Sequence, residues 1–187
     1  MRAPGTQEMD VGMIRIVALC GSLRSDSLNR RALLVARAWT PPDCAIALWE
    51  GLAGLPPFTP DLDRADEPAP APVEDFRRDV GAADGLLIAC PEYAHGIPGA
   101  FKNALDWLVG DTAFPGKPVA LMNVAPRASH AQAQLREVLT TMSATIVDEA
   151  CCTSAFPRPD EPESFSAFER AVRDALAAYA AFLRRAP

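Results

Sequence analysis

Groups that can bind an anion are concentrated in the segment GSLRSDSLN at residues 21–29. Within it stand three serine hydroxyls, an amide and a guanidinium, from Ser22, Ser25, Ser27, Asn29 and Arg24. A planar guanidinium matches the oxygens of a phosphate, and hydroxyl and amide groups donate hydrogen bonds to them. The segment joins an apolar run to a helical pattern, and a helix N-terminus offers unpaired N–H groups with a partial positive charge. We therefore expect an anion site here.

Simple helix capping is the alternative interpretation of this segment. Ser25, Asp26 or Ser27 would suit an N-cap, but a cap explains only one of the polar residues. Neither GxGxxG nor GKS/GKT is present, so a dinucleotide pyrophosphate and a nucleoside triphosphate are not favoured, although Glu50 stands where the dinucleotide motif places its ribose ligand. A serine-rich loop with few glycines suits a single terminal phosphate better.

A second candidate segment is PEYAHGIPG at residues 91–99. Its two prolines and two glycines stiffen the loop and let its backbone approach a ligand closely. Tyr93 and His95 supply ring faces or polar tips. We expect Pro91–Gly96 to lie against a flat ligand, with a routine strand-to-helix turn as the alternative. Three large apolar residues that follow at helical spacing are expected in the core: Phe101, Leu105 and Trp107.

Both segments belong to an alternation of short apolar runs and longer helical patterns. Strands are expected at Ile14–Cys20, Cys44–Glu50, Ala83–Cys90, Pro118–Val124 and Ala144–Glu149. Helices are expected at Ser27–Trp39, Pro72–Val80, Pro98–Gly110, Ser129–Met142 and Ser164–Arg184. Strands separated by helices predict an α/β fold, with a parallel sheet covered on both faces. In such sheets ligands bind at the carboxyl ends of the strands, where both candidate segments fall.

Two proline-rich connections interrupt this regular pattern, at Gly51–Pro72 and Phe156–Pro162. Connections of this length are either functional or surface excursions, and the sequence leaves both interpretations open. Residues 1–12 are expected to be a disordered extension, and residues 13–187 a single domain.

Composition narrows the function classes. Of the 187 residues, 49% are apolar and 22% charged, the balance of a soluble globular protein without a membrane span. A net charge of -6 argues against nucleic-acid binding. Five cysteines without a CxxC pair fit neither a disulfide framework nor a zinc site, so we expect no metal, and Cys20 and Cys90 are expected to be buried free thiols. A reducing cytoplasm is the expected compartment.

The two candidate segments together carry a family resemblance. GSLRSDSLNRRAL resembles the GSxRxxSxN loop of the NADPH-dependent FMN reductase family, which includes bacterial chromate and quinone reductases. PEYAHGIPGAFKNALDW resembles that family's PEYNHSIPGxLKNAIDW almost residue for residue. LPPFTPDLD, AADGLLIA and QLREVL agree in placement, so the resemblance covers about residues 14–147.

The resemblance implies a flavodoxin-like three-layer α/β/α domain, with five parallel strands in the order 2-1-3-4-5 and FMN bound non-covalently. It implies that NADPH or NADH reduces the flavin, which then reduces free flavin, a quinone, chromate or an azo compound. It also implies a homodimer or homotetramer. The implied cofactor-binding residues are Ser22, Arg24, Ser27, Leu28, Asn29, Pro91, Glu92, Tyr93, Ala94, His95, Gly96 and Arg127. No side-chain acid or base is required, so no catalytic residue is named.

The sequence also departs from the family pattern. Ala94 and Gly96 replace the usual Asn and Ser, and Ala125–His130 stands where the family often has a glycine-rich loop. Weaker flavin binding or an altered redox potential would follow. Two rival hypotheses remain at this point: a flavodoxin-type electron carrier reduced by a protein partner, and a flavin-free module that uses only the phosphate loop.

Overall fold

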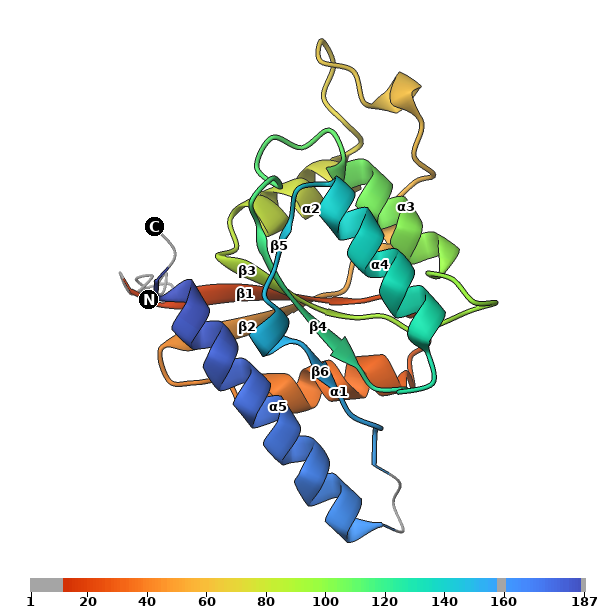
Figure 1. The fold of residues 1–187 in the computed structure, drawn as a ribbon. Helices are drawn as coiled ribbons and strands as arrows, with labels where there is room; N and C mark the ends of the chain where they lie inside the picture. Colours follow the sequence, from red (N-terminus) through yellow and green to blue (C-terminus); the bar gives the residue numbers. More distant parts are fainter. Residues whose placement is uncertain (1–11, 158–160, 186–187) are drawn as a thin grey trace, which may run out of the picture.

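A parallel β-sheet forms the centre of the molecule (Figure 1). The computed structural model describes residues 12–157 and 161–185, so the expected N-terminal extension lies, except for Gly12, outside the described residues. The strands follow the order β2-β1-β3-β4-β5, with β6 also pairing with β4, as predicted for a flavodoxin-like domain. Their bounds are β1 Ile14–Cys20, β2 Cys44–Trp49, β3 Gly85–Ala89, β4 Pro118–Asn123, β5 Thr145–Ile146 and β6 Cys152–Thr153.

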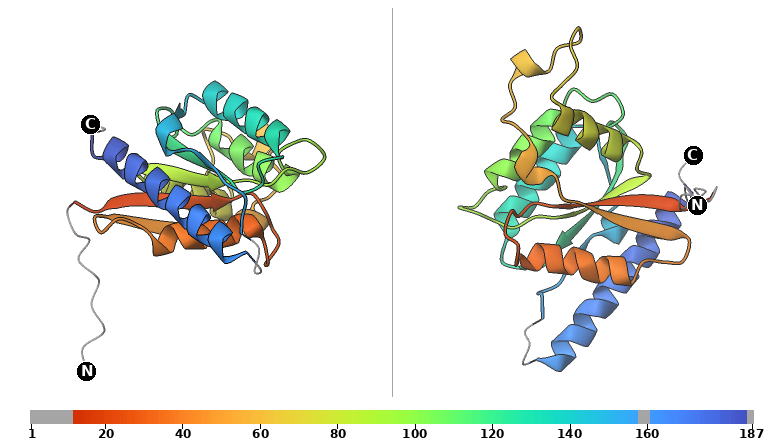
Figure 2. Two further views of the ribbon diagram at one scale, coloured as in Figure 1. Left: turned by 60° about the horizontal axis from the view of Figure 1, so that its bottom comes forward. Right: turned by 180° about the vertical axis from the view of Figure 1, so that it is seen from behind.

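Helices cover both faces of this sheet (Figures 1 and 2). One face carries α1 (Leu28–Ala38) and α5 (Pro162–Leu183). The other carries α2 (Ala71–Gly81), α3 (Gly99–Leu108) and α4 (Ser129–Thr141). The three-layer arrangement confirms the predicted fold class, and each helix agrees with its predicted range to within about two residues at either end. No helix in the described part of the chain is long and apolar enough to cross a bilayer.

Strand β3 lies at the middle of the sheet and is buried along its whole length. Because successive side chains of a strand point to opposite faces, Leu86 and Ile88 enter the core under α2–α4, and Leu87 enters the core under α5. Tyr179 of α5 is fully buried, with its hydroxyl 2.9 Å from the carbonyl oxygen of Leu86 and 2.8 Å from that of Pro118. This contact ties α5 to the two central strands.

The predicted fifth strand, Ala144–Glu149, is wrong in its extent. Only Thr145–Ile146 pair with β4 before a short 3-10 turn, Asp148–Ala150, after which Cys152–Thr153 resume the pairing. A continuous strand would place positions 147 and 150 on opposite faces. The turn instead buries Val147 and Ala150 in the same core, and it leaves Asp148 exposed to pair with Arg136 of α4.

The first proline-rich connection is a projecting excursion that is fastened at its base (Figure 1, gold). Asn103 of α3 accepts a hydrogen bond from Phe58 N at 2.7 Å and donates one to Pro56 O at 2.9 Å. The Trp107 indole N–H also donates to Pro56 O, at 2.8 Å. Two side chains of the KNALDW segment therefore hold the excursion against α3.

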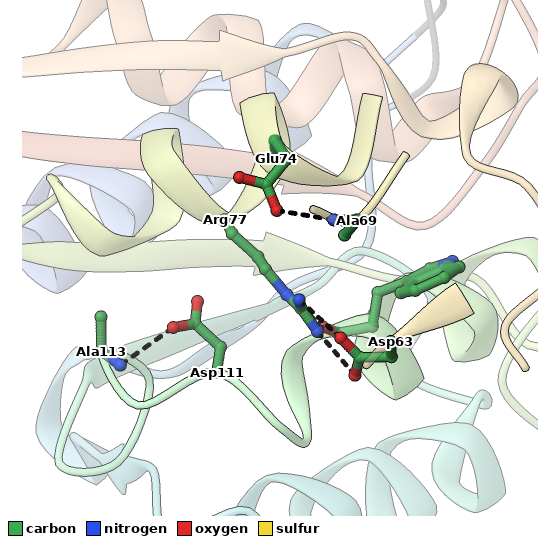
Figure 3. Close-up of polar contacts among 7 residues, drawn as sticks. Asp63, Ala69, Glu74, Arg77, Asp111 and Ala113 are labelled. Atoms are coloured by element: carbon green, nitrogen blue, oxygen red, sulfur yellow. Dashed lines mark hydrogen bonds and ion pairs between the residues drawn. The ribbon is translucent and has the colours of Figure 1, made fainter. Parts of the chain in front are cut away.

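A partly buried ion pair holds the outer part of the same excursion (Figure 3). Arg77 of α2 donates to both carboxylate oxygens of Asp63, at 2.8 and 2.9 Å, and its Nε donates to Trp107 O at 2.8 Å. The guanidinium holds the pKa of the Asp63 carboxyl below its usual value. The excursion is thus a bound part of the fold. In the second connection, Phe156 packs against Phe168 of α5, and residues 158–160 lie outside the described residues.

Candidate functional site

Three loops meet at the carboxyl edge of the sheet, after β1, β3 and β4 (Figure 1, right). We call them the first loop (residues 21–27), the second loop (91–98) and the third loop (124–128). The first loop passes close to the end of β3, with Gly21 N donating to Ala89 O at 2.8 Å. A Cβ at Gly21 would lie 2.8 Å from the sulfur of Cys90 and 3.1 Å from its Cα. Only glycine fits this approach without a shift of backbone.

Where the first loop leads into α1, some polar side-chain groups have no hydrogen-bond or ion-pair partner among the described residues. Ser27 is the N-cap residue and is buried, yet its side chain makes no capping hydrogen bond. Asn29 is 7% exposed, and its Oδ1 has no hydrogen-bond partner among the described residues. The Ser22 hydroxyl accepts from Arg24 N at 3.3 Å. The exposed side chain of Arg24 forms no ion pair with any residue that the structure describes.

The second loop ends β3 in a tight left-handed turn. Tyr93 and Gly96 exchange two backbone hydrogen bonds of 3.0 Å across the turn. Ala94 and His95 occupy its centre with φ of 50° and 59°, a region that costs an ordinary L-residue about 1–2 kcal/mol. The backbone N–H groups of these two residues have no acceptor in the described part of the chain.

Glu92 joins the second loop to α4. Its Oε2 accepts from Ala131 N at 2.9 Å, in the first turn of α4, and its Oε1 lies 3.4 Å from His95 Nδ1. Gln134 of the same helix accepts from Ile97 N at 2.7 Å. The N-cap residue of α4 is Ala128, whose side chain cannot accept a hydrogen bond. Glu92 therefore provides an acceptor for Ala131 N, one of the backbone N–H groups that the first turn of a helix leaves unpaired.

The third loop is held from within by Asn123, whose Oδ1 accepts from Ala125 N at 3.0 Å. Arg127 is exposed at its tip, and its side chain has no partner among the described residues. The two histidines of the chain meet between the second and third loops. Their ring centroids, in His95 and His130, lie 4.4 Å apart with the planes nearly perpendicular.

The structure brings the predicted site residues together through contacts that the sequence does not reveal. The Ser22 hydroxyl lies 3.5 Å from the Tyr93 hydroxyl, which links the first and second loops. Leu28 is about half exposed at the start of α1, beside the first loop. Arg127 makes no hydrogen bond or ion pair with the other predicted residues in the described part of the chain. Gln134 and Asn123 were not predicted, because an isolated amide carries no signal in the sequence about the distant backbone group that it will bind.

Burial disfavours the thiolate form of the cysteines near the site. All five cysteines are free; Cys90 is buried as expected, and Cys20 is half-buried. Burial raises the pKa of Cys90 to about 12 and also raises that of Cys20, so both thiols stay protonated at neutral pH. Among the described residues no group of His, Cys, Asp and Glu is arranged to hold a metal ion.

These features match the two ends of an FMN molecule. The N–H groups of the first turn of α1, the Asn29 amide N–H₂ and the Ser27 hydroxyl can donate to a terminal phosphate, whereas Asn29 Oδ1 is an acceptor and needs a donor such as a ligand hydroxyl. The two free N–H groups of the second-loop turn suit the polar edge of a flat ring. Fold and site together define a flavodoxin-like protein of the FMN-binding class.

Comparison with known proteins identifies the family within that class. Residues 14–157 match the NADPH-dependent FMN reductase family, and the chain belongs to it. It is therefore an NAD(P)H-dependent oxidoreductase that uses FMN. Over 131 residues it is 40% identical to an NAD(P)H-dependent FMN reductase of Pseudomonas aeruginosa, covering 67% of this chain and 69% of that protein. Over 141 residues it is 30% identical to a quinone reductase of Escherichia coli K12, covering 73% and 74%.

A solved structure supports the fold. The flavoenzyme NAD(P)H:(acceptor) oxidoreductase of Paracoccus denitrificans superposes with a TM-score of 0.77, covering 92% of this chain and 98% of that one. At 24% identity this similarity concerns the fold alone.

Proposed function

We propose that the chain reduces quinones and related soluble acceptors with electrons from NAD(P)H, and that the first and second loops hold the FMN that carries them. The observation that carries this proposal is the N-terminus of α1, where buried Asn29 leaves its Oδ1 without a hydrogen-bond partner and the preceding loop presents Arg24 without an ion pair among the described residues. A buried amide oxygen without a partner is costly unless a ligand donates a hydrogen bond to it, as a hydroxyl group of FMN can. The quinone reductases among the relatives support the choice of acceptor.

Bound FMN supplies hydride acceptance from a nicotinamide and electron delivery to the acceptor. The protein contributes charge and position. Arg24, Ser22 and Ser27 bind the phosphate end, and the N–H groups of Ala94 and His95 donate to the ring, where they stabilise added negative charge.

The other named residues of the second loop have supporting parts. Pro91 and Gly96 keep the loop rigid and close to the ring, and half-exposed Tyr93 offers an aromatic face. Glu92 acts through α4, because its carboxylate is committed to Ala131 N. Leu28 and Arg127 flank the phosphate and ring ends. We also propose a homodimer or homotetramer in the cytoplasm, without nucleic-acid partners.

The test is anaerobic reduction of the purified, FMN-loaded protein. NADPH or NADH should bleach the visible flavin absorbance, and a quinone added afterwards should restore it. Free FMN under the same conditions is the control. Absence of bleaching with both nicotinamides would contradict the proposal. A blue semiquinone that persists during titration would instead favour the electron-carrier hypothesis.

A further inference from the structure

The two histidines of the chain form a contact to which the proposed function gives no role. His95 of the second loop and His130 in the first turn of α4 have ring centroids 4.4 Å apart, with the ring planes nearly perpendicular. The sequence contains no other histidine. Imidazole is the side chain that ordinarily gains or loses a proton near neutral pH, so both such groups of this chain lie at the carboxyl edge of the sheet.

Packing does not account for this contact. The His95 side chain is 76% exposed, and His130 is exposed as well, so the pair buries little apolar area. His95 also holds a left-handed backbone with φ of 59°, where glycine would be free of strain. Residues in such conformations cluster at functional sites. Exposure and backbone conformation together indicate that the His95 side chain serves a ligand.

Glu92 lies behind His95 as a fixed carboxylate. Its Oε1 is 3.4 Å from His95 Nδ1, and its Oε2 accepts a hydrogen bond from Ala131 N at 2.9 Å. The Glu92 side chain is only 15% exposed. Among the described residues no other charged group lies within ion-pair distance of either imidazole. The carboxylate occupies Nδ1, which leaves Nε2 of His95 as the nitrogen that can bind a ligand.

Reduction of a quinone needs a group of this kind. A quinone becomes a hydroquinone by taking up one hydride and one proton. The hydride, which bound flavin supplies, brings both electrons and forms one O–H bond. The second O–H bond needs a proton from an acid. The nearby thiols of Cys20 and Cys90 are poor sources, because burial raises the pKa of both.

We propose that His95 is the acid that protonates the bound quinone, with Glu92 holding its Nδ1 and His130 positioning its ring. In this step the Nε2–H bond of the imidazolium breaks, its electron pair stays on the nitrogen, and the proton binds the quinone oxygen that the hydride does not reach. A proton from solvent then restores the imidazolium. The inference rests on the proposed function, because it assigns a residue to the acceptor half of that reaction.

Two acceptors separate proton transfer from electron transfer. FMN-loaded protein is reduced with light, and its re-oxidation is followed by stopped flow. Duroquinone takes up electrons and protons and does not alkylate thiols, whereas ferricyanide takes up electrons alone. His95→Asn should lower the ratio of the duroquinone rate to the ferricyanide rate by about 100-fold or more, the usual contribution of a general acid. Asparagine tolerates the left-handed backbone, so the variant keeps the turn.

The pH dependence gives the sign of the effect. Because the acid acts in its protonated form, the duroquinone rate of the unmodified chain should fall as pH rises through the neutral range. In His95→Asn this fall should be absent.

Two substitutions of His130 test its positioning role. Phenylalanine keeps an aromatic ring against His95, so His130→Phe should preserve both the ratio of rates and the fall with pH. His130→Ala removes the ring and should lower the ratio while the fall with pH remains. A His130→Phe variant with the low ratio and flat pH profile of His95→Asn would assign the proton to His130 and overturn the inference.

Contact between His95 and the acceptor has a readout that needs no turnover. Because the chain has only two histidines, proton NMR of tag-free protein separates the two sets of imidazole signals, and His95→Asn assigns them. Anthraquinone-2-sulfonate, added to oxidised FMN-loaded protein, should shift the His95 signals. Naphthalene-2-sulfonate, which lacks the carbonyl oxygens, should shift them less.

The outcomes separate the inference from the proposed function. An unchanged ratio of rates in His95→Asn, or His95 signals that the quinone does not move, overturns the inference even where NADPH bleaches the flavin. The expected effects of His95 in a protein that light reduces but neither nicotinamide bleaches would support the inference and refute the proposed function.

Discussion

The first and second loops lie side by side but differ in whether their polar groups already have partners within the protein. In the first loop and the start of α1 that follows it, Arg24 and Asn29 have side-chain groups without a partner among the described residues. The second loop is held by two backbone bonds across its turn, by Glu92 on α4 and by Gln134 on Ile97. The first loop therefore has polar groups available for an anionic ligand, whereas the second loop is already held by its own hydrogen bonds.

This difference predicts whether substitutions in each loop change FMN affinity or the stability of the flavin-free protein. A loop with open groups gains its contacts only when a ligand arrives, so its substitutions should change FMN affinity more than the stability of the flavin-free protein. A preorganised loop has its contacts in the folded state, so its substitutions should change stability as well.

The largest expected effect is that of Arg24→Ala on flavin binding. Loss of a charge-assisted hydrogen bond should weaken FMN binding by about 1.5–3 kcal/mol. The free energy of unfolding without flavin should change by no more than about 0.5 kcal/mol, because the side chain has no partner to lose. Flavin fluorescence titration and urea unfolding measure the two quantities. Arg37→Ala, at the exposed far end of α1, is the control; an equal loss of affinity there would break the comparison.

Gly21→Ala tests the junction between the loops. The added Cβ would meet the Cys90 sulfur at 2.8 Å and its Cα at 3.1 Å, so loop or strand must shift. Overpacking of this kind costs about 1–3 kcal/mol and should lower both stability and FMN affinity. Gly54→Ala is the matched control, since a Cβ there meets nothing within 4 Å. Unchanged unfolding of Gly21→Ala would show that the close approach is not required.

Glu92→Ala sharpens the comparison from the second loop. Removing the carboxylate leaves Ala131 N without its acceptor and should cost about 0.5–2 kcal/mol, as for a lost helix cap. Glu92→Gln keeps an acceptor oxygen and should recover most of that loss. Thermal unfolding of the flavin-free variants is the measurement. A destabilisation that appears only in the presence of FMN would place Glu92 with the first loop's open groups instead.

Ala94→Asn is the smallest of these effects and has the opposite sign. Asparagine tolerates the left-handed conformation that Ala94 holds at φ 50°, so the substitution should stabilise the flavin-free protein by about 0.5–1 kcal/mol. Ala125→Asn, in the third loop and outside the left-handed region, should not stabilise. Equal stabilisation by both variants would show that the left-handed backbone at Ala94 is not the cause of the effect.

Much of this arrangement was predictable from the sequence, because it depends on local patterns. Apolar runs and helical spacing located the elements, and their alternation gave the parallel sheet that brings the first and second loops to one edge. The split of the fifth strand was not predictable, since it depends on Val147 and Ala150 sharing one core.

The contacts within the site were predicted less well. Glu92 was expected at the flavin, and this stays a prediction; the contact of its carboxylate with Ala131 N of α4 was not predicted. The left-handed turn at Ala94 was not predicted, because this conformation is typical of glycine and asparagine and not of alanine. Both features arise from groups far apart in sequence or from strain imposed by the surroundings, which periodicity does not report.

The Asp63–Arg77 ion pair controls how easily a protease cleaves the projecting excursion, because protonation of Asp63 breaks the pair. Because Arg77 lowers the pKa of Asp63, the pair contributes stability above the ordinary carboxyl pKa of about 3.9, and this contribution is lost as pH falls through the lowered value. Asp63→Asn imitates the protonated state at neutral pH and should speed tryptic cleavage after neighbouring Arg64 while the rest of the domain stays folded. Asp43→Asn, which breaks a pair with Arg184 instead, should not. One carboxylate thus decides whether the enzyme is nicked before it unfolds.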